Sequence, residues 1–298
     1  MKSKIAFVTG AKGFIGRHLV KNLERQGFKV NCLKTDITKP ESYSITNNTS
    51  YVFHLAAKLS HRQSQSSITE KVNVFGTNEL LKKAIQLKNL KQFIYVSTIS
   101  VYGVTKFPAK ETSRKNPATP YEVTKLAAEK LVLEAHKKSG LIYTIVQPCV
   151  VFGPGDTASP LTTIYQLIKK KVFLPIGCHP VLLQTIFIDD LINGIMATID
   201  DPAALNQDFI MAGETVSLRQ LAKIIANVIK TPLLPGYLPV FLAKLMSNFI
   251  YHPHSLYFLL TNRVFSSAKA RHLLNFSAKT PLEKSLKQTI KWYQKNLP

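Results

Sequence analysis

Acidic residues are scarce in this sequence, above all towards its end. The chain of 298 residues has 39 Lys and Arg against 17 Asp and Glu, and after Glu214 its only acidic residue is Glu283. The resulting net charge of +22 bears on the partners of the protein rather than on its fold. It suits a pyrophosphate ligand, a lipid surface or a nucleic acid, and equally a basic surface that contacts only water.

Cysteine is also rare, and long apolar runs are missing. The three cysteines, Cys32, Cys149 and Cys178, are far apart and odd in number, which argues against a disulfide framework and against a cysteine metal site. No run of about 18 uncharged apolar residues exists, so we expect no membrane-spanning helix. The apolar run near the N-terminus is too short for a signal peptide. We therefore expect a cytoplasmic protein without a metal ion, and peripheral contact with a membrane stays open.

The apolar fraction of 45% is ordinary for a globular protein, and its pattern predicts an α/β fold. Over the first 200 residues, short β-branched runs alternate with amphipathic helical patterns. This alternation predicts a parallel sheet with right-handed crossovers. We expect strands at residues 5–8, 30–33, 51–55, 93–97 and 143–146, and helices at residues 13–23, 70–87 and 121–138.

After Pro148 the alternation of strands and helices loosens, beginning with a loop signal at residues 153–156. We predict a Rossmann-type, doubly wound parallel sheet in residues 1–150, to which a segment near residues 180–200 returns. A smaller C-terminal, substrate-binding lobe is expected in residues 151–298.

A glycine-rich loop follows the first expected strand. Gly10, Gly13 and Gly16 have the spacing G-x-x-G-x-x-G and lead into an amphipathic helix. Glycines allow a tight turn and bring backbone N–H groups close to a pyrophosphate, and the helix N-terminus adds a partial positive charge. This context predicts a dinucleotide site, although a plain strand–turn–helix connection can carry the same glycines.

The residue at the end of the second expected strand bears on the choice of cofactor. Classical NAD sites place an acidic residue there to hold the ribose 2′-hydroxyl. This chain has Lys34, a cation that suits the 2′-phosphate of NADP. The next acidic residue is Asp36, and the preference would reverse if Asp36 held the ribose. We expect NADP or NAD, with NADP favoured.

Two later segments supply candidate catalytic groups. The fourth expected strand runs into Thr98, and Tyr121 and Lys125 lie four residues apart on one helix face. This helix begins with a capping box formed by Thr119 and Glu122. A nearby ammonium lowers the pKa of a tyrosine, which is ~10 when free. The pair can therefore exchange a proton with a substrate oxygen, while Thr98 hydrogen-bonds that oxygen.

With this order of glycine loop, strand-end hydroxyl, tyrosine and lysine, the chain resembles the extended short-chain dehydrogenase/reductase family, also called the NAD-dependent epimerase/dehydratase family. The resemblance runs over nearly the whole chain. Its motifs lie at residues 9–16, 36–38, 52–57, 73–77, 97–103, 121–125, 147–156, 187–191, 268–271 and 292–293.

The resemblance implies roles for individual residues. Thr98, Tyr121 and Lys125 match the catalytic trio of the family. With the glycine loop and Lys34 included, the residues expected at the cofactor are Gly10, Gly13, Phe14, Ile15, Gly16, Lys34, Asp36, Ile37, Leu55, Ala56, Ala57, Asn73, Ser97, Tyr121, Lys125 and Pro148.

Three positions depart from the family pattern. Gln147 replaces the usual arginine, Ser266 or Ser267 stands at a usual aspartate, and Lys34 replaces the common acidic residue. None of these changes removes the catalytic trio. Their effects fall on substrate contacts and on cofactor preference.

Members of the family mostly act on nucleotide sugars, by 4-epimerisation, 4,6-dehydration or 4-keto reduction. Ile99 and Ser100 stand where a dehydratase carries an Asp-Glu pair. The resemblance therefore implies an epimerase or a 4-keto-sugar reductase of the kind used in surface-polysaccharide synthesis. We also expect a homodimer.

The anionic half of a nucleotide sugar needs cationic partners. Arg219, Arg263 and Arg271 are candidates because arginine binds phosphate bidentately, and Arg263 is preferred. Ser100 is the fourth expected substrate contact.

Two alternatives to a nucleotide-sugar enzyme stay open. One is a steroid- or flavonol-type oxidoreductase of the same family, whose substrate would meet the apolar residues 240–260. The other is a non-catalytic NADP-sensing or RNA-binding protein, suggested by the charge. No RNA-binding motif is visible, so we do not expect a nucleic acid partner.

Overall fold

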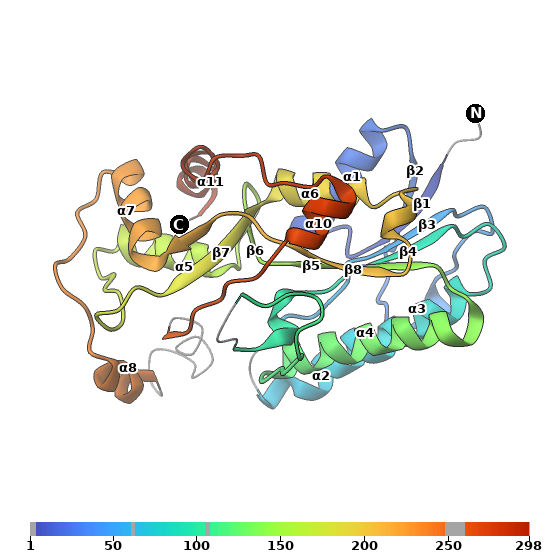
Figure 1. Cartoon of the computed structure of the whole chain (residues 1–298), viewed down its shortest axis with the longest axis horizontal. Coiled ribbons are helices and arrows are strands. Elements are labelled where there is room, and N and C mark those ends of the chain that lie inside the picture. Colours follow the sequence, from blue (N-terminus) through green and yellow to red (C-terminus); the bar gives the residue numbers. More distant parts are fainter. Residues whose placement is uncertain (1–3, 61–62, 105–107, 248–259, 298) are drawn as a thin grey trace.

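The fold is built around a six-stranded sheet with the strand order β2-β1-β3-β4-β5-β8 (Figure 1). The computed structural model describes residues 4–60, 63–104, 108–247 and 260–297. The strands of the sheet are β1 (Ile5–Thr9), β2 (Lys29–Cys32), β3 (Tyr51–His54), β4 (Gln92–Val96), β5 (Tyr143–Pro148) and β8 (Gln207–Met211). Every neighbouring pair is parallel, so the predicted doubly wound parallel sheet is confirmed.

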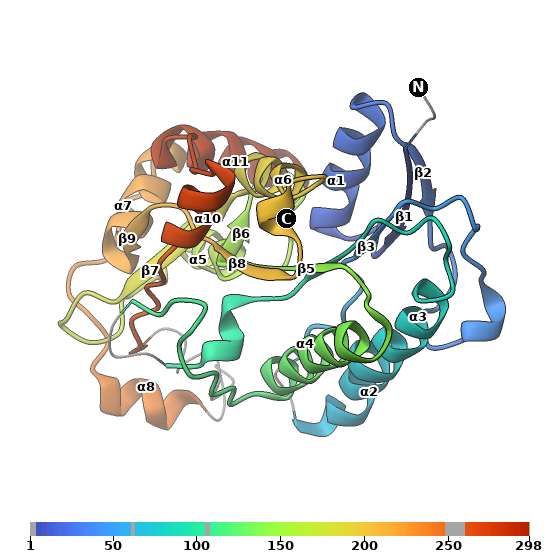
Figure 2. The same cartoon turned by 45° about the vertical axis from the view of Figure 1, so that its right-hand side comes forward.

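Helices cover both faces of this sheet (Figures 1 and 2). One face carries α1 (Phe14–Arg25), α6 (Ile188–Ala197) and α10 (Ala268–Leu274), and the other carries α2 (Ser66–Glu70), α3 (Gly76–Ala84) and α4 (Pro120–Ser139). Because parallel strands are buried on both sides, adjacent residues of one strand serve opposite cores. In β4, Tyr95 belongs to the core beneath α4, and its neighbour Ile94 belongs to the core beneath α1.

The helical run after β3 differs from the helix predicted at residues 70–87. It begins at Ser66, ends at Ala84 and has a π-helix, Lys71–Phe75, in its middle. Asn73 and Thr77 are both buried at this π-turn. The 3.6-residue period used for the prediction describes a regular α-helix and therefore misses the turn.

Helix α4 begins as predicted, with a capping box. The hydroxyl of Thr119 accepts the N–H of Glu122 at 3.2 Å, and the carboxylate of Glu122 accepts the N–H of Thr119 at 3.0 Å. Pro120 takes the first helical position, and Gly140 ends the helix in the left-handed conformation. The capping box fixes where the helix starts, and hence where Tyr121 lies relative to the sheet.

A smaller mixed sheet with the order β6-β7-β9 lies beside the first. Its strands are β6 (Val150–Phe152), β7 (Leu182–Phe187) and β9 (Thr215–Ser217), and the helices of this part are α5 (Pro160–Lys169), α7 (Leu218–Ile229), α8 (Val240–Ser247) and α11 (Leu282–Asn296). Short 3₁₀-helices lie at Pro40–Ser42, Gln63–Gln65, Ile99–Tyr102 and Pro202–Ala204. The hydroxyl of Tyr293 in α11 donates to the carboxylate of Asp156 at 2.8 Å, which ties the last helix to the loop after β6.

Two features are absent from the residues that the structure describes. None of their helices is long and apolar enough to cross a bilayer. They also include no group of three His, Cys, Asp or Glu side chains that would hold a metal ion.

The strand order reverses between β1 and β3. Strand β2 lies on one side of β1, and β3, β4, β5 and β8 lie on the other. Ligands of open α/β sheets bind at the carboxyl ends of the strands, next to such a reversal. Thr9, His54 and Val96 are the last residues of β1, β3 and β4, and most of the expected site residues follow these three ends.

Candidate active site

The glycine-rich loop turns sharply between β1 and α1. Gly10 has a φ of 70°, and a Cβ atom there would lie 2.7 Å from the backbone nitrogen of Ala56. A Cβ atom on Gly16 would lie 2.1 Å from the carbonyl oxygen of Gly10. Both positions therefore require glycine. Helix α1 begins after Gly13 with no side-chain cap and no acidic residue in its first turn, so this helix end suits a phosphate.

A chain of hydrogen bonds joins β1 to α3 through His54. The buried imidazole has Thr9 Oγ1 at 2.7 Å from Nδ1 and Thr77 Oγ1 at 2.7 Å from Nε2. Thr77 donates its hydroxyl proton to the carbonyl oxygen of Asn73, and Thr9 Oγ1 accepts the N–H of Ala56. The tautomer with its proton on Nε2 satisfies every one of these contacts. Burial lowers the pKa of His54 to about 3, so the ring is neutral.

Asn73 clamps the segment that leaves β3. Its carboxamide oxygen accepts the N–H of Lys58 at 2.7 Å, and its amide nitrogen donates to the carbonyl oxygen of Lys58 at 3.1 Å. The same nitrogen donates to the hydroxyl of Thr124 at 3.0 Å. The expected cofactor residues 55–57 are therefore held between the glycine loop and α4.

Other strand-end residues also fit a dinucleotide. The hydroxyl of Ser97, directly after β4, is buried and has no hydrogen-bond partner among the described residues. Pro148 at the end of β5 and Ile37 after β2 are buried, and Phe14 and Ile15 are half-buried in the first turn of α1. NAD or NADP would fit both features, the unsatisfied hydroxyl at the end of β4 and the loop after β1 that only glycine permits.

Thr98 follows Ser97 at the end of β4. It caps the 3₁₀-helix Ile99–Tyr102, and its Oγ1 accepts the N–H of Ser100 at 3.2 Å. Because this bond uses a lone pair, the hydroxyl proton of Thr98 is left to donate to another oxygen. The backbone N–H of Ser100 therefore orients the hydroxyl of Thr98, which we expect to hydrogen-bond the substrate.

Lys125 joins α4 to the same strand end. Its buried ammonium donates to the carbonyl oxygen of Val96 at 2.7 Å and lies 4.2 Å from the centre of the Tyr95 ring. Tyr121 lies one helical turn before Lys125. The first turns of α4, with Tyr121, are thus held at the strand end from which Thr98 emerges.

The pKa values of this pair differ from the sequence-based expectation. Burial lowers the pKa of Lys125 to about 7, although Glu129 opposes the shift. Burial raises the pKa of Tyr121 to about 12, and Glu122 adds to the rise. The expected lowering of the Tyr121 pKa by Lys125 is therefore wrong for this arrangement, in which the ammonium faces Val96. Tyr121 keeps its proton at neutral pH.

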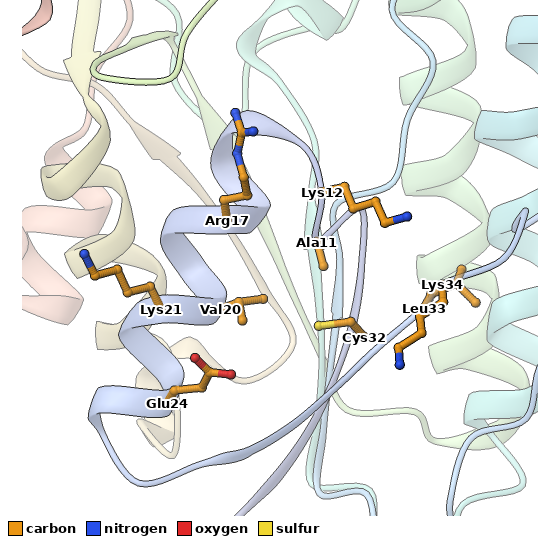
Figure 3. A pocket seen from close by; sticks show the side chains of 9 residues that line it. All are labelled: Ala11, Lys12, Arg17, Val20, Lys21, Glu24, Cys32, Leu33 and Lys34. Carbon is orange, nitrogen blue, oxygen red and sulfur yellow. The ribbon is translucent and has the colours of Figure 1, made fainter. Parts of the chain in front are cut away.

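A shallow hollow of about 450 Å³ lies beside the glycine loop (Figure 3). Lys12 of that loop and Lys34 after β2 line it, together with the acidic Glu24 of α1. Sequence reasoning singled out Lys34 but missed Lys12, whose place inside the glycine pattern was the available signal. Asp36 is exposed, and its carboxylate accepts the N–H of Thr38 at 2.9 Å, which lowers the pKa of that carboxyl.

Comparison with known proteins decides the family. A model of the NAD dependent epimerase/dehydratase family matches residues 6–212. The chain belongs to this family. The predicted family and the prediction of an enzyme are thereby confirmed, and the family is one of NAD-dependent enzymes.

Relatives match most of the chain at low identity. UDP-glucose 4-epimerase of Vibrio cholerae is 27% identical over 82% of this chain and 82% of its own length. The 3beta-hydroxysteroid-dehydrogenase/decarboxylase isoform 1 of Arabidopsis thaliana is 25% identical over 95% of this chain and 78% of its own. The solved UDP-glucose 4-epimerase of Thermotoga maritima is 23% identical, with a TM-score of 0.83 over 99% of this chain and 100% of its own. This structural likeness shows the Rossmann-type fold.

Gln147, where the epimerase/dehydratase pattern usually has arginine, lies in a buried polar network. Its carboxamide oxygen accepts the hydroxyl of Tyr102 at 2.8 Å, and its amide nitrogen donates to Glu129 at 2.8 Å. Lys115 donates to the other carboxylate oxygen of Glu129 at 2.6 Å and supplies a positive charge there. Sequence reasoning missed Glu129, although its position four residues after Lys125 was visible.

The three arginines predicted to bind substrate phosphate are spread over the structure. Arg263 is buried, with Nη1 at 3.9 Å from a carboxylate oxygen of Glu122 in the first turn of α4. Arg219 in α7 is half-buried and donates to the carbonyl oxygen of Gly177 at 3.3 Å. Arg271 is exposed on α10, on the sheet face that also carries α6 (Figure 1). The structure thus brings Arg263 to the start of α4 and places Arg271 elsewhere.

Proposed function

We propose that this enzyme oxidises or reduces carbon 4 of a nucleotide-linked sugar with NAD(P), in a 4-keto reduction or a 4-epimerisation. The observation that carries the proposal is the bond from Lys125 to the end of β4, which holds Tyr121 at the strand end that bears Thr98. The names of the Vibrio cholerae and Thermotoga maritima relatives, both UDP-glucose 4-epimerases, support the substrate class.

Each side chain of the trio has a role that follows from its bonds. When bound, the nicotinamide cofactor would exchange a hydride with the sugar carbon. Tyr121 keeps its proton at neutral pH and donates it to the oxygen of a keto sugar. Thr98 Oγ1 already accepts from Ser100, so its hydroxyl donates to the same oxygen. Lys125 donates to the carbonyl oxygen of Val96 and so positions the first turns of α4, with Tyr121, for this transfer.

The preferred form of the cofactor is NADP(H). Lys12 and Lys34 line one hollow beside the glycine loop at the end of β2. Cations at this position suit a 2′-phosphate, to which they would donate charge-assisted hydrogen bonds. Glu24 is the acidic residue among those that line the hollow, and it lies on α1 rather than at the strand end.

Calorimetric titration with NADPH and NADH tests this preference. We expect NADPH to bind more tightly, and Lys12→Ala/Lys34→Ala to lose at least about tenfold in NADPH affinity, as expected for lost charged contacts. The affinity for NADH should change little in the same variant. Tighter binding of NADH by the unaltered enzyme would reverse the proposal.

The reaction is tested by NMR on purified enzyme with either cofactor. UDP-glucose, UDP-glucuronate and a UDP-linked 4-keto sugar are the substrates. An epimerase converts the first two into 4-epimers without net change of the cofactor, and a reductase consumes NAD(P)H with the keto sugar. Turnover of a 3β-hydroxysteroid, with none of any nucleotide sugar, would favour the second candidate, to which the name of the Arabidopsis thaliana relative points.

We also propose a homodimer, in which the face of α2 and α4 supplies part of a larger interface. Ile68, Phe75 and Val123 have exposed fractions of 53, 42 and 49% on this helical layer. Burial of exposed apolar side chains drives association. Light scattering should give the mass of a dimer, and Ile68→Glu/Val123→Glu should give that of a monomer. A monomer mass for the unaltered protein would rule the dimer out.

A further inference from the structure

The segment from Leu234 to Leu245 displays an apolar surface that the proposed reaction does not use. Its exposed apolar side chains, called here the α8 patch, are Leu234, Tyr237, Val240, Phe241 and Leu245, with exposed fractions of 44, 47, 36, 69 and 68%. Phe241 and Leu245 are the most exposed large apolar side chains among the described residues. They lie four residues apart, on one face of α8.

The inner side of this segment is packed on the protein. Ala243 is fully buried and clusters with Ile176. Leu238 donates its N–H to the carbonyl oxygen of Pro175 at 2.9 Å and accepts the N–H of Gly177 at 2.9 Å. The α8 patch is therefore the outward face of an anchored helix, at the periphery of the molecule (Figure 1).

The C-terminal part of the sequence, which contains the patch, is basic and almost free of acidic residues. From residue 215 to the C-terminus there are twelve Lys and Arg residues, and Glu283 is the single acidic residue. Exposed Lys230 precedes the patch, and exposed Lys244 lies one turn from Phe241 on α8 itself. A helix that combines exposed aromatic and aliphatic side chains with lysine matches the boundary between anionic headgroups and acyl chains.

We propose that the α8 patch docks the enzyme on the surface of a membrane that contains anionic phospholipids. Phe241 and Leu245 enter the boundary between headgroups and acyl chains, and the lysines contact the phosphates. A second copy of the chain fits the patch less well. A stable dimer buries about 800 Å² per partner with roughly 20–30 residues a side, whereas the patch consists of five side chains.

Co-sedimentation of the full chain with vesicles tests the proposal. Vesicles of phosphatidylglycerol and phosphatidylcholine in equal parts are compared with vesicles of phosphatidylcholine alone. We expect binding to the anionic vesicles and at least about tenfold weaker binding to the neutral ones. Phe241→Ser/Leu245→Ser should bind the anionic vesicles about 30-fold more weakly, because two apolar side chains no longer enter the membrane.

A matched control separates the patch from general apolarity. Ile85→Ser/Ile142→Ser also removes two exposed apolar side chains, with exposed fractions of 41 and 36%, and should bind as the unaltered chain does. Lys244→Glu offers a second test that leaves the apolar side chains in place, and it should weaken binding to anionic vesicles severalfold without changing binding to neutral ones.

Four results would overturn the proposal. They are no binding by the unaltered chain, equal binding to both kinds of vesicle, equal binding by the Phe241→Ser/Leu245→Ser variant, and loss of self-association in that variant without vesicles. The last result would assign the patch to a second copy. The unfolding midpoints of the variants, all altered at exposed positions, show that the fold is kept.

Discussion

Glu129→Gln separates the electrostatics of the candidate site from its packing. Glu129 is buried one turn after Lys125 on α4, and its charge holds the pKa of Lys125 up against the effect of burial. Glutamine has nearly the same shape, and its oxygen can still accept the hydrogen bond that Gln147 donates at 2.8 Å. The substitution therefore removes the negative charge and keeps most of the packing.

The size of the effect follows from the separation of the two charges. Side chains four residues apart on a helix lie about 6 Å apart, which gives about 2.8 kcal/mol at an effective dielectric constant of about 20. Lys115, at 2.6 Å from Glu129, offsets part of this interaction. We therefore expect the pKa of Lys125, about 7 in the native site, to fall by on the order of one unit.

The other groups that face Lys125 do not change charge near neutral pH. Burial keeps His54 neutral by lowering its pKa to about 3, and burial raises the pKa of Tyr95 and that of Tyr121 above the ordinary value. A change in the pKa of Lys125 near neutral pH should therefore report the loss of the negative charge of Glu129.

The assay is the pH dependence of kcat. If the ammonium of Lys125 is needed for turnover, the alkaline limb of the Glu129→Gln profile lies about one unit lower, with an unchanged rate at acidic pH. Lys115→Gln is the matched control, because it breaks the same ion pair but keeps the charge of Glu129. Its alkaline limb should not move down. A Glu129→Gln profile that falls equally at every pH would show a structural role alone and refute the reasoning.

Three further predictions concern single side chains. Tyr121→Phe keeps the ring but loses the proton donor, so kcat should fall by about 10²–10⁴-fold with cofactor affinity nearly unchanged in calorimetry; a retained kcat would assign the proton transfer to another group. The pKa of His54 is about 3 in the folded state and ~6.5 in the unfolded state. Because only the unfolded state binds a proton between these values, the free energy of unfolding decreases as the pH falls from about 6.5 towards 3. Urea unfolding should show a loss of about 2 kcal/mol between about pH 7 and 5, and the same loss in His54→Gln would contradict this. Arg263→Ala should raise KM for a UDP-linked 4-keto sugar by about tenfold or more at similar kcat, and an unchanged KM removes Arg263 from the site.

Local patterns were sufficient to predict five of the six strands of the main sheet and the start of α4, but not β8 (Gln207–Met211). The strand expected at residues 5–8 is Ile5–Thr9, because a short apolar run bounded by a turn is a strand buried on both faces. The capping box at Thr119 involves residues three apart, so it is visible in the sequence and present in the structure. The π-helix Lys71–Phe75 was not predictable from periodicity, because its buried Asn73 bonds to Lys58, fifteen residues away.

The chemistry of the site depended on burial, which the sequence alone does not supply. The spacing of Tyr121 and Lys125 predicts that they share one helix face. It does not predict that both side chains are buried deeply enough for their pKa values to shift. Lys12 was missed for a related reason. It lies inside the glycine pattern, and only the turn of the loop brings it to the hollow that Lys34 also lines.

The neighbourhood of Gln147 shows how the site balances a buried charge. Glu129 has an exposed fraction of 1%, and a carboxylate at that depth is costly without a cation. An arginine in β5 would be a buried partner, whereas Lys115 is one-fifth exposed and also lies 3.7 Å from Asp208. Salt screens such a partly exposed pair more strongly than a buried one. The field of Glu129 at Lys125, and with it the alkaline limb of the pH profile, should therefore depend on ionic strength, and Gln147→Arg should remove that dependence.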